Sequence, residues 1–154
     1  MGLAFNHMEM LEHLAGRKGK GRVQTTAFFG KTYGEAMHLL LEARDYLTYR
    51  EPRDRALLSP LDRLRLCCET MRLTARLTEI MAWLLSQRAV HAGEMSQEEA
   101  LSRHRALAEL KVCVDGLDAT ETAMPRGIAS LLERSRALYI RVARLDELAR
   151  RQLH

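Results

Sequence analysis

The chain has few of the residues that interrupt helices or cross-link small domains. Of its 154 residues, only three are proline, three are cysteine and 5% are aromatic. So few prolines leave room for long helices. The cysteine number is odd, and Cys67 and Cys68 are adjacent, which does not suit the disulfide framework of a secreted domain. We therefore expect a reducing compartment, namely the cytoplasm.

Targeting signals and catalytic motifs are also missing. No stretch reaches the ~18 apolar residues of a membrane span. The first residues (MGLAF) lack a basic segment followed by a long apolar one, so we expect no signal peptide. The sequence contains no phosphate-binding glycine loop, no C-x-x-C pair and no nucleophile elbow. These absences favour a cytoplasmic protein that is not an enzyme and needs no cofactor.

Charge is mildly positive and well mixed. The chain has 24 Lys and Arg against 20 Asp and Glu, for a net charge of +4. Such a balance permits contact with nucleic acid or with acidic proteins. Acids are interspersed with the bases nearly everywhere, which favours solvated helix faces instead. The exception is GRKGKGR at residues 16–22, which predicts a flexible basic leader over 1–24 before a helical domain over 25–152.

Three amphipathic stretches predict three long helices, because their apolar residues recur at steps of three and four. The first should run from about 26 to 50 and end before Pro52. The second should start at Pro60, since proline suits the first helical position, and stop at Gly93. The third should run from about 126 to 152, and Arg134, Arg141, Arg144 and Arg151 flank its apolar side.

A short helix should follow the second long one. Ser96 and Glu99 form a capping box, in which each side chain satisfies a free backbone N–H group. We see no strand alternation. The predicted fold is therefore all-α, an antiparallel three-helix bundle with a short extra helix after the second long helix.

The second helix carries two apolar seams and one polar stripe on a helical wheel. Two seams predict that it packs against two neighbours at once, and we expect Cys67 to be a buried small hydrophobe. The first apolar seam consists of Leu66, Leu73, Leu77, Ile80 and Leu84, and the second of Leu64, Cys67, Met71, Ala75, Ala82, Leu85 and Ala89. The polar stripe consists of Asp62, Arg65, Glu69, Arg72, Arg76, Glu79 and Ser86.

Trp83, the single tryptophan, falls at the centre of the polar stripe. Tryptophan and arginine are frequent anchors of protein interfaces, but a lone tryptophan can equally be covered by another part of its own chain. The pattern leaves both interpretations open. On the first one, the hypothetical partner-binding surface comprises Glu69, Arg72, Arg76, Glu79, Trp83 and Arg88.

One pattern hints at a metal. Glu35 and His38 form an E-x-x-H pair, and di-iron bundles use two such pairs with two further carboxylates. Only one pair is present, and His38 lies between Glu35 and Glu42 at helical spacing, as an exposed histidine bracketed by acids would. We therefore expect no metal site.

Several long runs resemble a known family. They are residues 29–37 (FGKTYGEAM), 58–64 (LSPLDRL), 69–77 (ETMRLTARL), 83–90 (WLLSQRAV) and 141–147 (RVARLDE). Together they are similar to the RcdA family of alphaproteobacteria, the regulators of CtrA degradation. The resemblance extends over about residues 27–149.

The resemblance implies a three-helix bundle that forms a homodimer. It also implies an adaptor for the ATP-dependent ClpXP protease in cell-cycle control, which docks on protease primed by a single-domain response regulator and tethers a transcription regulator as cargo. Tethering makes weak cargo contacts intramolecular and so raises their effective concentration. The alternative function, which rests on charge, is a nucleic-acid-binding transcriptional regulator.

Overall fold

The computed structural model describes residues 20–115 and 124–153. It divides into two units, residues 1–34 and 35–154. The described part of the first unit is the beginning of helix α2 (Lys20–Asp45), in which Thr32 Oγ1 donates a hydrogen bond to the carbonyl of Phe28. Most of the predicted leader, residues 1–19, lies outside the described residues. Helix α2 itself begins six residues earlier than position 26, where we predicted its start.

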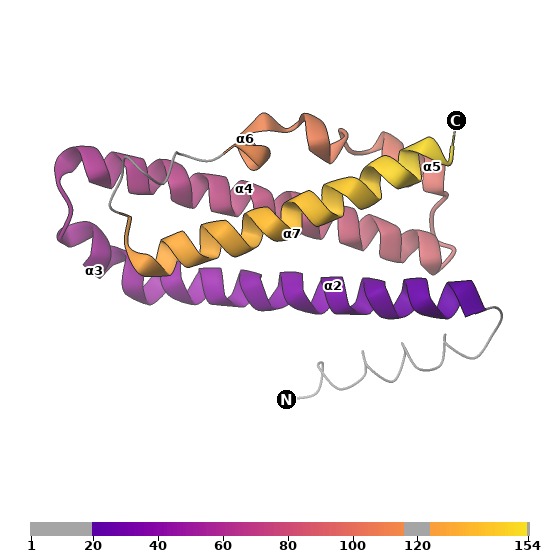
Figure 1. Cartoon of the computed structure of the whole chain (residues 1–154), viewed down its shortest axis with the longest axis horizontal. Coiled ribbons are helices and arrows are strands. Elements are labelled where there is room, and N and C mark those ends of the chain that lie inside the picture. Colours follow the sequence, from indigo (N-terminus) through magenta and orange to yellow (C-terminus); the bar gives the residue numbers. More distant parts are fainter. Residues whose placement is uncertain (1–19, 116–123, 154) are drawn as a thin grey trace. The chain divides into compact units, whose positions relative to one another are not determined.

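The second unit contains the end of α2 and seven further elements, all of them helical. The π-helical turn η1 (Tyr46–Arg50) and α3 (Glu51–Ala56) follow α2 directly. Then come α4 (Pro60–His91), α5 (Gln97–Ser102), the 3-10 turn η2 (Leu107–Glu109), α6 (Lys111–Val114) and α7 (Arg126–Arg151). The prediction of an all-α fold is thus confirmed for the described residues (Figure 1).

Helix α4 has the limits that its sequence predicts. The Ser59 hydroxyl accepts a hydrogen bond from the backbone N–H of Asp62, and Pro60 occupies the first helical position. The helix ends at His91, and Gly93 follows with a φ of 75°, a left-handed conformation that glycine adopts without steric cost. Helix α5 also starts as predicted, because the Ser96 hydroxyl accepts from the N–H of Glu99.

The first helix ends before Pro52, as predicted, but the chain stays helical beyond it. Proline lacks an N–H and normally breaks an α-helix. Here the chain widens into η1, where the N–H of Glu51 reaches the carbonyl of Tyr46, and Pro52 then lies in the first turn of α3. N–H groups in the first turn of a helix have no acceptor within that helix, so a proline there costs no hydrogen bond. The chain therefore stays helical to Ala56.

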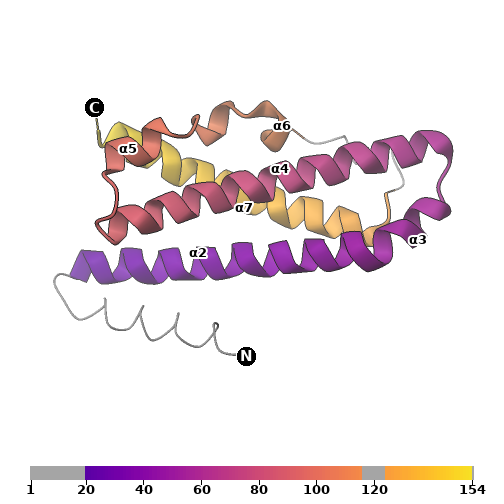
Figure 2. The same ribbon diagram turned by 180° about the vertical axis from the view of Figure 1, so that it is seen from behind.

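The helix directions correct one part of the prediction. Arg76 of α4 contacts Leu132 of α7, and Trp83 contacts Asp146, so residue numbers rise together and α4 runs parallel to α7. Both views of the ribbon show them side by side (Figures 1 and 2). The bundle is therefore not antiparallel throughout, because the segment with α5 and α6 carries the chain back along α4 before α7 begins.

The core lies between α4, α7 and the end of α2. The first apolar seam of α4 is buried throughout, as predicted. Ile128, Leu131, Leu138 and Val142 of α7 and Ala36, Leu39 and Ala43 of α2 are buried as well. Arg134 forms a bidentate ion pair with Glu42, and Arg141 pairs with Glu35. These two bridges show that the end of α2 runs antiparallel to α7.

Candidate protein-interaction face

The structure places the predicted polar stripe of α4 mostly beneath other parts of the chain. Three members of the hypothetical partner-binding surface, Glu69, Arg76 and Trp83, are at most 5% exposed. The other three, Arg72, Glu79 and Arg88, are half-buried. The stripe is covered because α5 and α6 pack against α4. Whether any of the six residues contacts a partner stays a prediction.

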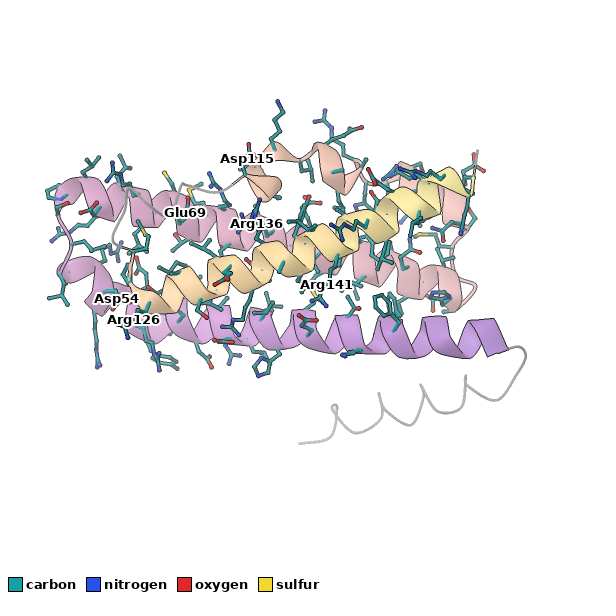
Figure 3. All side chains as sticks on the ribbon, in the orientation of Figure 1. Asp54, Glu69, Asp115, Arg126, Arg136 and Arg141 are labelled. Carbon is teal, nitrogen blue, oxygen red and sulfur yellow. The ribbon has the colours of Figure 1, made fainter. Side chains whose placement is uncertain are left out.

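Arg76 ties three helices together. Its Nε donates to the carbonyl of Cys113 at 2.5 Å and its Nη2 to that of Asp115 at 3.0 Å, while Nη1 donates to the carbonyl of Leu132 at 3.2 Å. Figure 3 labels Asp115, which directly follows α6. Burial lowers the pKa of this guanidinium. Burying a charge that is hydrogen-bonded to carbonyl groups costs much less free energy than burying an unpaired charge. Arg76 therefore holds α6 against α4 and α7.

Trp83 belongs to a second buried polar cluster. Its indole N–H donates to Asp146, whose carboxylate also accepts from the backbone N–H of Leu107 and from Arg150. Arg150 in turn donates to the carbonyls of Leu101 and His104. The structure therefore shows that other parts of the same chain cover Trp83, which is the second of the two interpretations.

The half-buried Arg72 and the buried Glu69 form an ion pair, with Nη1 of Arg72 and Oε1 of Glu69 3.2 Å apart. The geometry is not that of a hydrogen bond, and these two atoms and Nε of Arg72 have no hydrogen-bond partner among the described residues. Figure 3 labels Glu69 on α4. An ion pair so deeply placed is weak evidence for stability.

The second apolar seam of α4 is largely exposed. Leu64 is 62% exposed, Met71 68% and Leu85 48%, and Cys67 is exposed as well, contrary to prediction. The large side chains of the second seam therefore lack the cover that the first seam has within the described chain. We call this side the exposed α4 face, and it comprises the exposed Leu61, Leu64, Cys68, Met71, Thr78 and Leu85 together with the half-buried Ala75, Ala82 and Ala89.

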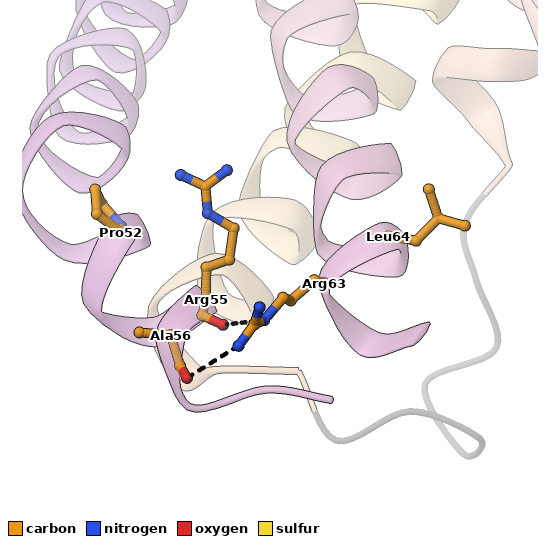
Figure 4. Close-up of a pocket in the computed structure, with 5 residues that line it drawn as sticks. All are labelled: Pro52, Arg55, Ala56, Arg63 and Leu64. Atoms are coloured by element: carbon orange, nitrogen blue, oxygen red, sulfur yellow. Dashed lines mark hydrogen bonds between the residues drawn. The ribbon is translucent and has the colours of Figure 1, made fainter. Parts of the chain in front are cut away.

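A pocket of about 650 Å³ adjoins this face at the turn between α3 and α4 (Figure 4). Arg63 and Leu64 line it together with Pro52, Arg55 and Ala56. The guanidinium of Arg63 donates to the carbonyls of Arg55, Ala56 and Leu58, at and just beyond the end of α3, where no further helical turn supplies donors. Arg63 therefore has a capping role, and the pocket has no charged group that is both buried and unpaired.

The Glu35 and His38 pair does not gather further ligands. Glu35 is bound to Arg141, which Figure 3 labels on α7, and the side chain of His38 is 80% exposed, 3.9 Å from Glu42. Among residues 20–115 and 124–153, no group of three His, Cys, Asp or Glu side chains could hold a metal ion. These carboxylates instead take part in the pairing of α2 with α7.

Sequence reasoning missed two of the residues that organise this region, Asp146 and Arg150. A signal was present, because Asp146 follows Tyr139 by seven residues and Val142 by four, the spacing of a core position. A carboxylate at a buried position requires hydrogen-bond donors nearby. The single tryptophan of the chain was available as one of them.

The helical architecture and the comparisons with known proteins together define the class. A family model described as "Protein of unknown function (DUF1465)" matches residues 20–154, so this is an all-helical member of that family. The crystal structure of RcdA from Caulobacter crescentus CB15 is 36% identical, with a TM-score of 0.61, and the match covers 79% of this chain and 89% of that chain. The chain belongs to the RcdA family.

A search of curated proteins found no match. Within the described residues, no helix combines the length and the apolar character that crossing a membrane requires.

Proposed function

We propose that this protein is a cytoplasmic proteolytic adaptor that binds other proteins and carries out no catalysis. It would dock on ClpXP protease primed by a single-domain response regulator and tether a transcription regulator as cargo. The observation that carries the proposal is membership of the RcdA family, at 36% identity over most of both chains. The exposed α4 face supports it, because contiguous exposed apolar surface is typical of protein-binding sites.

A reconstituted degradation assay tests this function. Purified ClpXP, ATP, the response regulator and a candidate cargo regulator are incubated with and without the full chain, and the half-life of the cargo is followed. We expect faster cargo loss only when the adaptor and the response regulator are both present, because tethering requires both. Equal cargo half-lives with and without the chain would overturn the proposal.

The predicted stripe can be tested in the same assay. Arg72 and Arg88 are the half-buried basic members of the hypothetical partner-binding surface, and charge reversal at either should slow cargo loss if that surface meets a partner. Arg144, an exposed arginine of α7, provides the matched control. If Arg72→Glu, Arg88→Glu and Arg144→Glu all behave like wild type, the stripe has no part in binding.

The alternative, a nucleic-acid-binding regulator, has less support. Of the four arginines that flank the apolar side of α7, Arg134 and Arg141 are already bound to carboxylates of α2. Binding that depends on phosphate contacts weakens steeply with salt. Fluorescence anisotropy with a labelled DNA duplex at low and high salt decides between the two functions, and absence of binding at low salt removes the alternative.

A further inference from the structure

A second cavity, of about 330 Å³, lies where η1, α3 and the start of α7 meet. Its volume is within the roughly 300–1,000 Å³ that small-molecule sites occupy. In Figure 3, Asp54 on α3 and Arg126 at the start of α7 are labelled side by side at this end of the bundle. A π-helical turn such as η1 is a common feature of functional sites. The lining residues that decide its chemistry are Tyr46, Arg50, Arg53, Asp54, Arg126 and Gly127.

The cavity gathers three arginines and a single carboxylate. Arg50, Arg53 and Arg126 are exposed, and no ion pair or hydrogen bond within the described residues involves their guanidinium groups. The carboxylate, that of Asp54, accepts a hydrogen bond from the Tyr46 hydroxyl at 2.8 Å. Three positive charges thus share the cavity with one negative charge, and like charges held in one place repel each other.

The larger pocket between α3 and α4 provides a contrast. There Arg63 donates to carbonyl groups at the end of α3, and Arg55 pairs with Glu51 at 3.4 Å. Both arginines therefore stabilise the fold itself. The three arginines of the second cavity have no such task within the described chain, so their shared position points to an anion that is not part of that chain.

We propose that this cavity, which we call the arginine pocket, binds the phosphate group of a small soluble molecule. A planar guanidinium can form two parallel hydrogen bonds with phosphate oxygens. Asp54 balances one of the three positive charges, and a phosphate group carries about −1.5 to −2 charges at pH 7, which balances the rest. A ligand with one carboxylate would leave a positive charge over. The inference goes beyond the adaptor function and does not depend on it.

The start of α7 adds to the attraction of an anion. Arg126 and Gly127 belong to its first turn, whose N–H groups have no acceptor within the helix. Among the described residues no side chain caps them, and that turn contains no acidic residue. The positive end of the helix therefore strengthens the field of the three arginines. The arginines, and not the helix end, define the site.

Isothermal titration calorimetry of the full chain tests binding. The probes are inorganic phosphate, pyrophosphate and ATP, in a phosphate-free buffer of low ionic strength without divalent cations. We expect saturable binding of at least one probe, with a dissociation constant that rises with added sodium chloride, because salt screens exposed charges. Similar affinities for phosphate and ATP would support recognition of the phosphate group alone, and a higher affinity for ATP would support a nucleotide ligand. Absence of binding by all three probes would overturn the proposal.

Two substitutions test whether the anion lies in the arginine pocket. Arg53→Ala and Arg126→Ala should each raise the dissociation constant roughly tenfold or more, because each removes a charge-assisted hydrogen bond. Arg55→Ala is the matched control, since it removes the same charge from the same helix as Arg53 but at a residue that is paired with Glu51. It should change the constant by less than about twofold, as a screened charge outside the pocket would. Equal losses in all three variants would show general electrostatic attraction and overturn the proposal.

A change at Asp54 should act in the opposite direction. Asp54→Asn keeps an acceptor for the Tyr46 hydroxyl but removes the negative charge from the pocket. The dissociation constant should therefore fall roughly threefold or more, because the anion no longer faces a like charge. A merely structural role of Asp54 does not predict tighter binding. An unchanged or higher constant in this variant, with circular dichroism showing that it is folded, would overturn the proposal.

Cosedimentation with phosphatidylglycerol vesicles separates a soluble ligand from a lipid headgroup. The comparison is needed because Leu57, which directly follows α3, is 88% exposed, and an apolar side chain beside arginines also suits an anionic membrane surface. We expect the chain to stay in the supernatant while the soluble probes bind. A chain that sediments with the vesicles and gives no heat with the three soluble probes would have a lipid contact here, which overturns the proposal.

Discussion

The indole Nε1 of Trp83 donates a hydrogen bond to Oδ1 of Asp146 over 3.0 Å, and both residues are buried. Oδ2 of the same carboxylate accepts from the backbone N–H of Leu107 at 2.9 Å. Nε of Arg150 lies 3.1 Å from both oxygens. One side chain thus satisfies donors from α4, from η2 and from α7 itself, and holds the returning segment against the two long helices.

We predict that Asp146→Ala destabilises the fold severely. The substitution leaves the indole N–H of Trp83 and the N–H of Leu107 buried without an acceptor, and it leaves Arg150 without its counter-ion. Removing one partner of a buried charged pair costs about 3–5 kcal/mol, and the free energy of unfolding in urea measures it. Glu147→Ala is the control, because its bridge to Arg151 is long and exposed, and such changes stay within about 0.5 kcal/mol. Equal stabilities of the two variants would contradict the role given to Asp146.

The limits of α4 were predictable because the signals that fix them are local. The Ser59 cap, Pro60 and Gly93 act within one helical turn of the residues they affect. The first apolar seam was predictable for the same reason, since helical spacing alone places its members on one side.

The place of Trp83 was not predictable, because it depends on contacts far along the chain. A helical wheel sets Trp83 among polar residues, and polar residues are ordinarily exposed. Here Arg76 is buried through carbonyls of α6 and α7, which lie 37 and 56 residues away in the sequence. Nothing local shows that α5 and α6 return along α4, so the sequence could not decide between a contact surface and cover by the same chain.

We predict that Arg76→Met loosens the segment around α6. Methionine fills similar space but removes the guanidinium donors of the carbonyls of Cys113, Asp115 and Leu132, and a buried acceptor that loses its donor costs stability. The thiol of Cys113 is buried, which raises its pKa and slows its reaction with a disulfide reagent. Labelling of Cys113 should therefore be much faster in the variant. The exposed Cys67 and Cys68 serve as internal controls, and an unchanged Cys113 rate would contradict the clamp.

We predict that alkaline pH destabilises the fold through Tyr139. Its hydroxyl donates to the carbonyl of Leu107 at 2.7 Å, and burial raises its pKa above the ordinary value. Because the unfolded chain releases this proton first, the free energy of unfolding should fall as the pH rises above about 10. Burial and Asp54 raise the pKa of Tyr46 as well, so Tyr139→Phe should lessen the decline and not abolish it. Urea titrations at several pH values measure this, with Tyr49→Phe, a change at a 70% exposed tyrosine, as the control.

We predict opposite effects from alanine at two glycines. A Cβ at Gly127, in the first turn of α7, would lie 2.7 Å from Cε2 of Tyr46. Gly127→Ala must therefore push the tyrosine ring away from its place beside α7, and overpacking of this kind costs about 1–3 kcal/mol. At Gly34, inside α2, a Cβ would meet open space. Gly34→Ala should stabilise the chain by roughly 0.5–1 kcal/mol, because alanine loses less backbone entropy in a helix.

A double-mutant cycle separates the clash at Gly127 from a general effect of alanine at that position. If the cost arises from the Tyr46 ring, Gly127→Ala should be nearly neutral in a Tyr46→Leu background, and the two changes should be strongly non-additive. Additive losses of stability would mean that the ring already moves freely and that Gly127 is needed for another reason. Because Tyr46 also donates to Asp54 at 2.8 Å, displacing its ring should loosen α3 as well. Faster amide exchange over residues 51–56 in Gly127→Ala, and not in Gly34→Ala, is the result that this arrangement requires.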